Sequence, residues 1–104
     1  MTRANYLTDG ITHSLIVVGH AGYNNDGRDV VCAGVSAVTY ALLGWLANHE
    51  KETTYLYKFV ESGSVTIICE GNEAVKTAFD VAVIGLMQIA EQYPDYMNME
   101  YKSR

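Results

Sequence analysis

The chain has 104 residues and a mass of 11.5 kDa, the size of a single domain with one core. Hydrophobic residues make up 49% of it and charged residues 18%, a composition that excludes a disordered chain. The net charge of −5 argues against direct binding of nucleic acid, whose phosphates attract basic surfaces, and is compatible with a basic peptide as partner.

Three features of the sequence indicate the cellular compartment. No apolar run reaches the roughly 18 residues of a membrane helix. The N-terminal segment MTRANYLTDGITHSLIVVGH lacks the basic start, apolar block and small-residue cleavage site of a signal peptide. Two cysteines without an export signal favour reduced thiols. We therefore expect a cytoplasmic protein without membrane contact, in which Cys32 and Cys69 form no disulfide.

The chain begins with two predicted strands, residues 2–8 and 11–18. The dipeptide Asp9-Gly10 between them is typical of a tight hairpin turn. In the second strand, alternate residues are predicted to share one face of the sheet: Ile11, His13, Leu15 and Val17.

A loop rich in glycine and asparagine is predicted over residues 19–29. It is long for a compact domain, and long loops are often functional or mobile. The helix predicted next, over about residues 30–49, has Asp29 as its expected cap. Its apolar residues recur at helical spacing on one face: Val31, Val35, Val38, Leu42 and Trp45. Beside them runs a stripe of small residues that would let another backbone come close: Ala33, Ala37, Ala41 and Gly44.

Residues 53–60 and 63–70 form a second predicted pair of strands. A second helix is expected over about 73–93, capped by Asn72 and stopped by Pro94, and the tail 96–101 adds a short edge strand. We therefore expect one α+β domain over residues 1–104. Its architecture is a two-layer sandwich in the order ββαββα, with an antiparallel sheet and both helices on one face.

Cys32 is the first candidate for chemistry. It is predicted to lie in the first turn of the first helix, where free amides and the helix dipole stabilise a thiolate. His20 begins the glycine-rich loop that ends near Cys32, with eleven residues between them, so an imidazole and a thiol can meet. A cysteine protease needs this pair. The alternatives are a buried cysteine that fills space and an ordinary hydrogen-bonded histidine.

Asp29 and Ser36 have two interpretations each. Asp29 is either a helix cap alone or also a residue that orients His20 or a substrate amide. Ser36 lies four residues after Cys32, on the same helix face, where it could donate a hydrogen bond near the reacting carbonyl or simply pack against the sheet.

Other chemistries find no support in the sequence. There is no phosphate-binding loop of the form GxxxxGK[ST] and no GxSxG nucleophile elbow. The three histidines and two cysteines contain no close ligand pair such as CxxC, so no metal site is expected. We expect no cofactor. Cys69 alternates with strand residues and is interpreted as core.

The segment GHAGYNNDGRDVVCAGVSAV, residues 19–38, closely resembles the signature of the ribosomal-processing cysteine proteases, the Prp family. In that family a GHA strand end leads through a glycine loop to a helix that starts G-x-D-[IV]-V-C-A-[AG]-x-S-A. The C-terminal GLMQIAEQYPDYMNM also resembles the family's second-helix ending. The weakly patterned N-terminal strand and the short charged stretch 48–54 depart from the family's pattern.

The resemblance implies a two-layer homodimer. It further implies removal of a short N-terminal extension from the large-subunit ribosomal protein numbered twenty-seven, or processing of a virion protein by phage-encoded relatives. Cys32 would be the nucleophile and His20 the general base, Asp29 and Ser36 would shape the substrate pocket, and Gly19 would be a hinge. A β-branched residue at Gly19 is then expected to slow turnover and leave the fold intact.

Assembly and loop behaviour complete the expectations. Trp45, the small-residue stripe and eight tyrosines are more apolar surface than a two-layer monomer easily covers, so we expect a homodimer. The loop 19–29 is expected to order when substrate binds. A different class of function, a non-catalytic dimer that binds a ribosomal or virion protein, remains the alternative to an endopeptidase.

Overall fold

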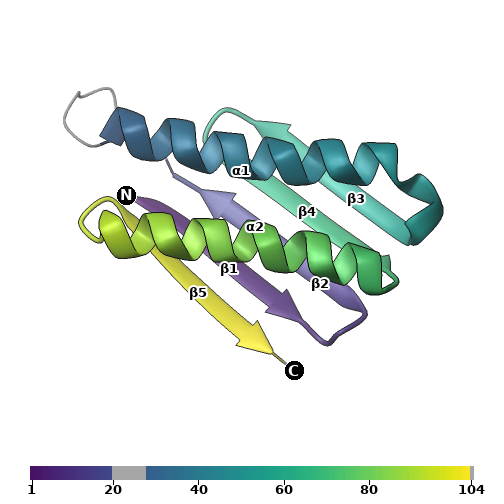
Figure 1. The fold of residues 1–104 in the computed structure, drawn as a ribbon. Helices are drawn as coiled ribbons and strands as arrows, with labels where there is room; N and C mark the ends of the chain where they lie inside the picture. The colour runs from purple at the N-terminus through teal and green to yellow at the C-terminus, as the bar shows by residue number, and fades with distance from the viewer. Residues whose placement is uncertain (20–27, 104) are drawn as a thin grey trace.

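The computed structural model of the chain describes residues 1–19 and 28–103, and of Arg28 and Asp29 only the backbone. In it two helices lie side by side across one face of a sheet (Figure 1). The elements are, in order, β1 (Thr2–Thr8), β2 (Thr12–Val18), α1 (Arg28–Asn48), a 3₁₀ turn (Glu50–Glu52), β3 (Thr53–Glu61), β4 (Ser64–Gly71), α2 (Glu73–Gln92) and β5 (Met97–Ser103).

The sheet has the strand order β3-β4-β2-β1-β5. Its pairs are antiparallel except at one edge, where β5 lies parallel to β1 with Met97 opposite Thr2. The parallel pair arises because α2 carries the chain back across the sheet before β5 begins. The expected α+β sandwich is thus confirmed, and its sheet is mixed where a wholly antiparallel one was expected.

The first hairpin forms as its turn residues predict. The Asp9 carboxylate accepts hydrogen bonds from the amides of Ile11 and Thr12 at 2.9 and 2.7 Å, and Gly10 adopts a φ of +96°. Because Ile11 belongs to this turn, it is 64% exposed and does not share the buried face of β2 as predicted. That face is formed by His13, Leu15 and Val17.

The core lies between the sheet and the helices. Alternate residues of each central strand point toward the helices. Buried residues therefore recur at every second position in these strands, and at helical spacing in α1 and α2. Its largest fully buried side chains include Tyr6, Leu15, Leu46, Ile67, Phe79 and Leu86.

Helix α1 begins at Arg28, two residues before the predicted start. Asp29 therefore lies within the first turn, and the prediction that it caps the helix is wrong. Cys32 correspondingly lies one full turn inside the helix, where its backbone amide already has an intrahelical partner. The free amides of the helix end therefore belong to earlier residues.

Helix α2 matches its predicted limits closely. The Asn72 side chain accepts hydrogen bonds from the amides of Ala74 and Val75, which confirms the predicted cap. The close packing of α1 against α2 depends on one glycine in each helix. A β-carbon at Gly34 would lie 3.2 Å from Ile89, and one at Gly85 would lie 3.4 Å from Val38. The predicted small-residue stripe of α1 is instead largely exposed.

The hydropathy of α1 bears on the prediction that the chain has no segment long and apolar enough to cross a membrane. Its segment Val30–Asn48 has a mean hydropathy of 1.9, so by length and composition it is apolar enough to cross a membrane. Core helices of folded domains meet the same criterion, and Val31, Val35, Leu42 and Leu46 are buried here. By this measure, the prediction that no apolar run reaches the length of a membrane helix is wrong.

Candidate active site

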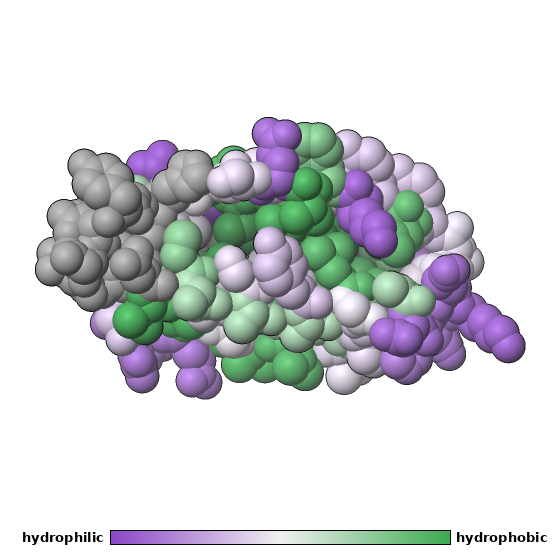
Figure 2. Space-filling model, turned by 90° about the horizontal axis from the view of Figure 1, so that it is seen from above, coloured by the Kyte–Doolittle hydropathy of each residue, from purple (hydrophilic) through white to green (hydrophobic). Residues whose placement is uncertain are grey.

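A cleft of about 480 Å³ opens between α1 and one end of the sheet. At this end, which we call the cleft end, β1 starts, β2 stops at Gly19, and β3 turns into β4. Figure 2 views the molecule from the side of α1 and this hairpin, and apolar residues gather along the middle of that face. The cleft itself is lined by both kinds of residue, with valines beside the hydroxyl groups of threonine and serine side chains.

The floor of the cleft is built by neighbouring strands. Val60 on β3 pairs with Val65 on β4, and Val65 pairs with Val17 on β2. On β1, Ala4 lies opposite Val17. Thr2, two residues before Ala4 on the same face, lines the cleft next to Gly19. The floor thus consists of three valines and one threonine, all on the face of the sheet that the helices cover.

The wall opposite the floor comes from α1. Cys32 and Ser36 both line the cleft, since four residues bring the helix back to the same face. The prediction that Ser36 lies beside Cys32 is confirmed. Cys32 is a half-buried free thiol, so a molecule in the cleft can reach its sulfur.

Gly19 lies between the start of β1 and the turn from β3 to β4. Its amide donates to the Gly63 carbonyl at 2.9 Å, and its φ is +110°. A β-carbon here would collide with the carbonyl oxygen of Met1 and approach the Thr2 Cα within 3.3 Å. A β-branched residue would therefore displace β1. The expectation that such a residue leaves the fold intact is wrong.

The other half of the predicted catalytic pair lies outside the described residues. This holds for His20, for the rest of the predicted loop up to residue 27, and for the side chain of Asp29. The chain attaches His20 directly to Gly19, and Gly19 lines the cleft. The structure thus brings together Cys32, Ser36 and Gly19 of the five predicted site residues.

Cys69 lies at the opposite end of the same sheet, which we call the sealed end. It is fully buried and pairs across β2 and β4 with His13. Burial raises the pKa of the Cys69 thiol to about 11. Its predicted place in the core is confirmed, and it is a free thiol like Cys32.

His13 belongs to a buried polar cluster at the sealed end. Its Nδ1 lies 2.8 Å from the Tyr6 hydroxyl and 2.9 Å from the Thr8 hydroxyl, and its ring stacks on Phe79. Its Nε2 has no partner among the described residues. Burial lowers the pKa of His13 and raises the pKa of Tyr6 to about 12, since each stays neutral more readily away from water.

The cleft includes residues that sequence reasoning missed. Thr2 was assigned only to a strand, and residues 61–64 only to a turn and the start of a strand, yet they form its floor and rim. The strand order explains both omissions, because the pairing of β4 with β2 brings the second hairpin beside Gly19. Local patterns carry no information on that order.

The comparisons with known proteins point in one direction. The family model described as "Cysteine protease Prp" matches residues 1–98. The "Ribosomal processing cysteine protease Prp" of Mycoplasma genitalium is 30% identical over 86% of this chain and 88% of its own length. The protein of that name from Staphylococcus aureus is 25% identical over 90% of this chain and 91% of its own length.

Solved structures share the fold. SMU.848 from Streptococcus mutans superposes with a TM-score of 0.80 at 26% identity, covering 100% of this chain and 96% of that one. A structure described as an essential ribosomal processing protease Prp from S. aureus, with a covalently linked product peptide, gives a TM-score of 0.83 at 23% identity. That match covers 98% of this chain and 100% of the other.

Proposed function

The chain belongs to the family of the cysteine protease Prp, and on that premise we propose that it is an endopeptidase that removes a short N-terminal extension from a large-subunit ribosomal protein precursor. The observation that carries the proposal is the accessible thiol of Cys32, set with Ser36 in a cleft of about 480 Å³. The ribosomal substrate rests on the names of the relatives, and a phage virion protein is the alternative substrate.

The proposed reaction proceeds through a thioester. His20 takes the proton of the Cys32 thiol, and the sulfur attacks the carbonyl carbon of the scissile peptide bond. As the bond breaks, the imidazolium returns the proton to the leaving amine. Water then hydrolyses the thioester, with the same imidazole as base, and frees the thiol. Ser36 and Asp29 are proposed to orient the peptide or the imidazole.

The rim of the cleft supports a basic peptide as substrate. Glu61, exposed at the end of β3, lines the cleft as its only charged residue among those the structure describes. Together with the net charge of −5, this carboxylate attracts lysine and arginine side chains that flank a scissile bond. The apolar floor is suited to an aliphatic or aromatic side chain of the same peptide.

Intact-mass analysis of the ribosomal precursor, before and after incubation, tests the proposal. Wild-type protein should remove the extension in one cut. Cys32→Ala and His20→Ala should each lower the rate about 10³-fold or more, because nucleophile and base act as a unit. Cys69→Ala and His49→Ala are the matched controls and should retain activity. A virion precursor, incubated in parallel, distinguishes the two substrates.

Two results would contradict the proposal. Cleavage that persists in Cys32→Ala would exclude the assigned nucleophile. Tight binding of the precursor with no change in its mass would favour the non-catalytic binding protein.

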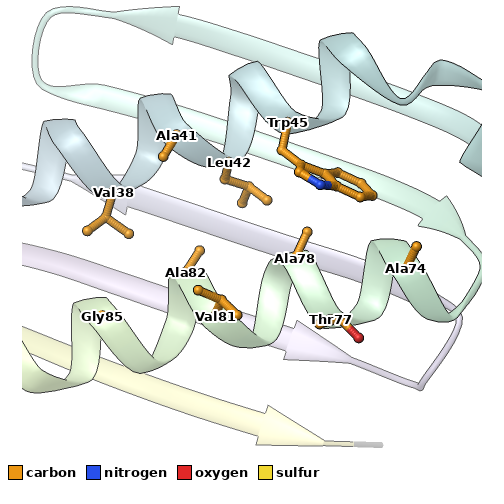
Figure 3. Close-up of a pocket in the computed structure, with 10 residues that line it drawn as sticks. All are labelled: Val38, Ala41, Leu42, Trp45, Ala74, Thr77, Ala78, Val81, Ala82 and Gly85. Carbon is orange, nitrogen blue, oxygen red and sulfur yellow. The ribbon is translucent and has the colours of Figure 1, made fainter.

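We further propose a homodimer that forms through the helix layer. A groove of about 600 Å³ runs between α1 and α2, and its labelled side chains come from both helices (Figure 3). Alanines and Gly85 form much of its lining, and the Trp45 ring lies along it. Beside it, Val81, Ile84 and Met87 of α2 are exposed. A second copy, related by a two-fold axis, would cover this face.

Light scattering tests the assembly at micromolar concentration. We expect a particle of about 23 kDa, twice the 11.5 kDa of one chain. Ile84→Lys on α2 should give a monomer, whereas Ile11→Lys, at an exposed position in the first hairpin, should leave the dimer intact. A wild-type particle of 11.5 kDa would exclude the dimer.

A further inference from the structure

The floor of the cleft contains a buried hydroxyl without a partner. Thr2 is 2% exposed, and its Oγ1 accepts and donates no hydrogen bond within the described part of the chain. Its backbone is held firmly, since its amide donates to the Tyr96 carbonyl at 3.0 Å and Met97 lies opposite it on β5. A buried polar group of this kind is costly and is rare in folded proteins.

Two other buried threonines show what is unusual about Thr2. Thr39 lines the same cleft, but its hydroxyl donates to the Val35 carbonyl at 2.9 Å, within its own helix. The Thr8 hydroxyl accepts from the Gly10 amide at 3.0 Å and lies 2.9 Å from His13 Nδ1. Among these three, only the Thr2 hydroxyl has no partner in the described residues, so both its proton and its lone pairs are available to a molecule in the cleft.

From this contrast we propose that Thr2 is a specificity-determining residue, whose hydroxyl hydrogen-bonds the substrate peptide on the cleft floor. The proposal rests on the proposed peptidase function. The chemistry of the floor indicates the group it binds. Val17, Val60 and Val65 take an apolar side chain and offer no polar contact, so a backbone amide or carbonyl beside that side chain needs a partner. A hydroxyl can serve either group, because it donates and accepts.

Threonine and valine have nearly the same shape, which makes a clean test available. Thr2→Val converts the floor to four valines without adding volume. Because the hydroxyl has no partner in the free protein, its removal should leave the thermal unfolding midpoint equal or higher. In the complex the Thr2 hydroxyl is proposed to have a partner. The Kd of the ribosomal precursor peptide should therefore be about three- to tenfold higher for the double variant Cys32→Ser, Thr2→Val than for Cys32→Ser alone. The two readouts thus move in opposite directions.

Two control variants sharpen the result. Thr53→Val makes the same chemical change outside the cleft, where the hydroxyl already donates to the Glu50 carbonyl at 2.9 Å, and should leave the Kd unchanged. Thr2→Ser retains the hydroxyl and should restore most of the affinity. A specificity role also predicts that Thr2→Val lowers kcat/KM of the active enzyme by the same factor as it weakens binding.

Each contrary outcome has a distinct meaning. A lower unfolding midpoint in Thr2→Val would show that the hydroxyl is already bonded in the free protein, for example to water, and would overturn the inference. An unchanged Kd on introducing Thr2→Val, in an experiment where the wild-type protein does cleave the precursor, would overturn it as well. Failure of the wild-type protein to cleave or bind any precursor would instead reject the proposed function on which the inference rests.

Discussion

The cleft end and the sealed end of the sheet each contain one cysteine, in opposite surroundings. Cys32 borders a cleft that is open to solvent. Cys69 is fully buried beside His13, and burial raises its pKa to about 11. Both ends are made from the same five strands. The difference therefore arises from what covers them: α2 packs over the sealed end with Phe79, whereas the cleft remains open below α1.

The contrast shows that one end of a small sheet can be tightly packed while the other end contains the candidate site. At the sealed end, aromatic rings stack on each other and on His13. At the cleft end, the apolar floor and the thiol of Cys32 line an open cleft. Binding sites need such incompletely covered surface, and rigid packing elsewhere makes it tolerable. Four predictions test whether the ends differ in the way described.

The largest expected difference is in thiol reactivity. Under native conditions at pH 8, iodoacetamide should modify Cys32 at least about 10²-fold faster than Cys69. Burial raises the pKa of Cys69 to about 11, which leaves about one thiol in a thousand ionised, against roughly a quarter for an ordinary cysteine. Burial slows Cys69 further. Peptide mapping by mass spectrometry measures both rates, and denaturant should abolish the difference. Equal labelling of both thiols in the folded protein would refute the contrast.

The two turn glycines should differ in their tolerance of a side chain. At the cleft end, Gly19→Ala adds a β-carbon against Met1 and Thr2 and should lower the free energy of unfolding by about 2–4 kcal/mol. At the sealed end, Gly10 has the same kind of φ but open space around it. Gly10→Ala should cost only about 1–2 kcal/mol. Urea unfolding of both variants gives the comparison, and equal losses would contradict it.

Acid should weaken the sealed end first. The folded-state pKa of His13 is lowered by burial, with Asp80 and Asp9 opposing the shift and Lys76 adding to it. The unfolded chain therefore binds the proton more readily. Stability is fully present above the unfolded pKa of about 6.5 and declines as pH falls toward the folded pKa.

Thermal unfolding between pH 7.5 and 5, chosen to bracket the pKa of about 6.5, measures this decline. The double variant His13→Val, Tyr6→Phe removes the buried imidazole and its hydroxyl partner, and should show a flatter pH profile. His49→Gln changes an exposed histidine and should keep the wild-type slope. An unaltered slope in the double variant would mean that other groups cause the decline.

The smallest effect is expected from charge at the rim. Glu61→Lys should raise KM for a basic precursor peptide about fivefold at low salt, since exposed charge pairs contribute little. The effect should fade at high ionic strength. Glu73→Lys makes the same change at the start of α2, at the far end of the sheet (Figure 1), and should leave KM unchanged. Equal effects of both variants would indicate net charge alone.

Much of the fold could be predicted because its signals are local. Asp9-Gly10 specified a turn, Asn72 a helix start and Pro94 a helix stop, and each side chain acts within a few residues of itself. The start of α1 was misplaced because Asp29 is as favourable within a first turn as at a cap. Ile11 was misplaced because its strand pattern extends one residue into the turn.

The site was predictable only where the chain brings its parts together locally. Cys32 and Ser36 share a helix face by spacing alone, so their proximity was foreseen. Thr2, Glu61 and Gly63 reach the cleft through strand order and register, which no periodicity encodes. Thr2 in particular shows nothing unusual in sequence, since a threonine in a strand is ordinary. Its unpaired hydroxyl is visible only in three dimensions.

The parallel pairing of β1 with β5 has a consequence for the order of folding. Each hairpin closes a short loop and can form early, whereas β1 and β5 come from opposite ends of the sequence and meet only after α2 has crossed the sheet. Thr2 is anchored to the residues that lead into β5. The strand that contributes Thr2 to the cleft floor is thus fixed by a pairing that forms late in folding. We therefore expect this part of the sheet to become ordered after both hairpins.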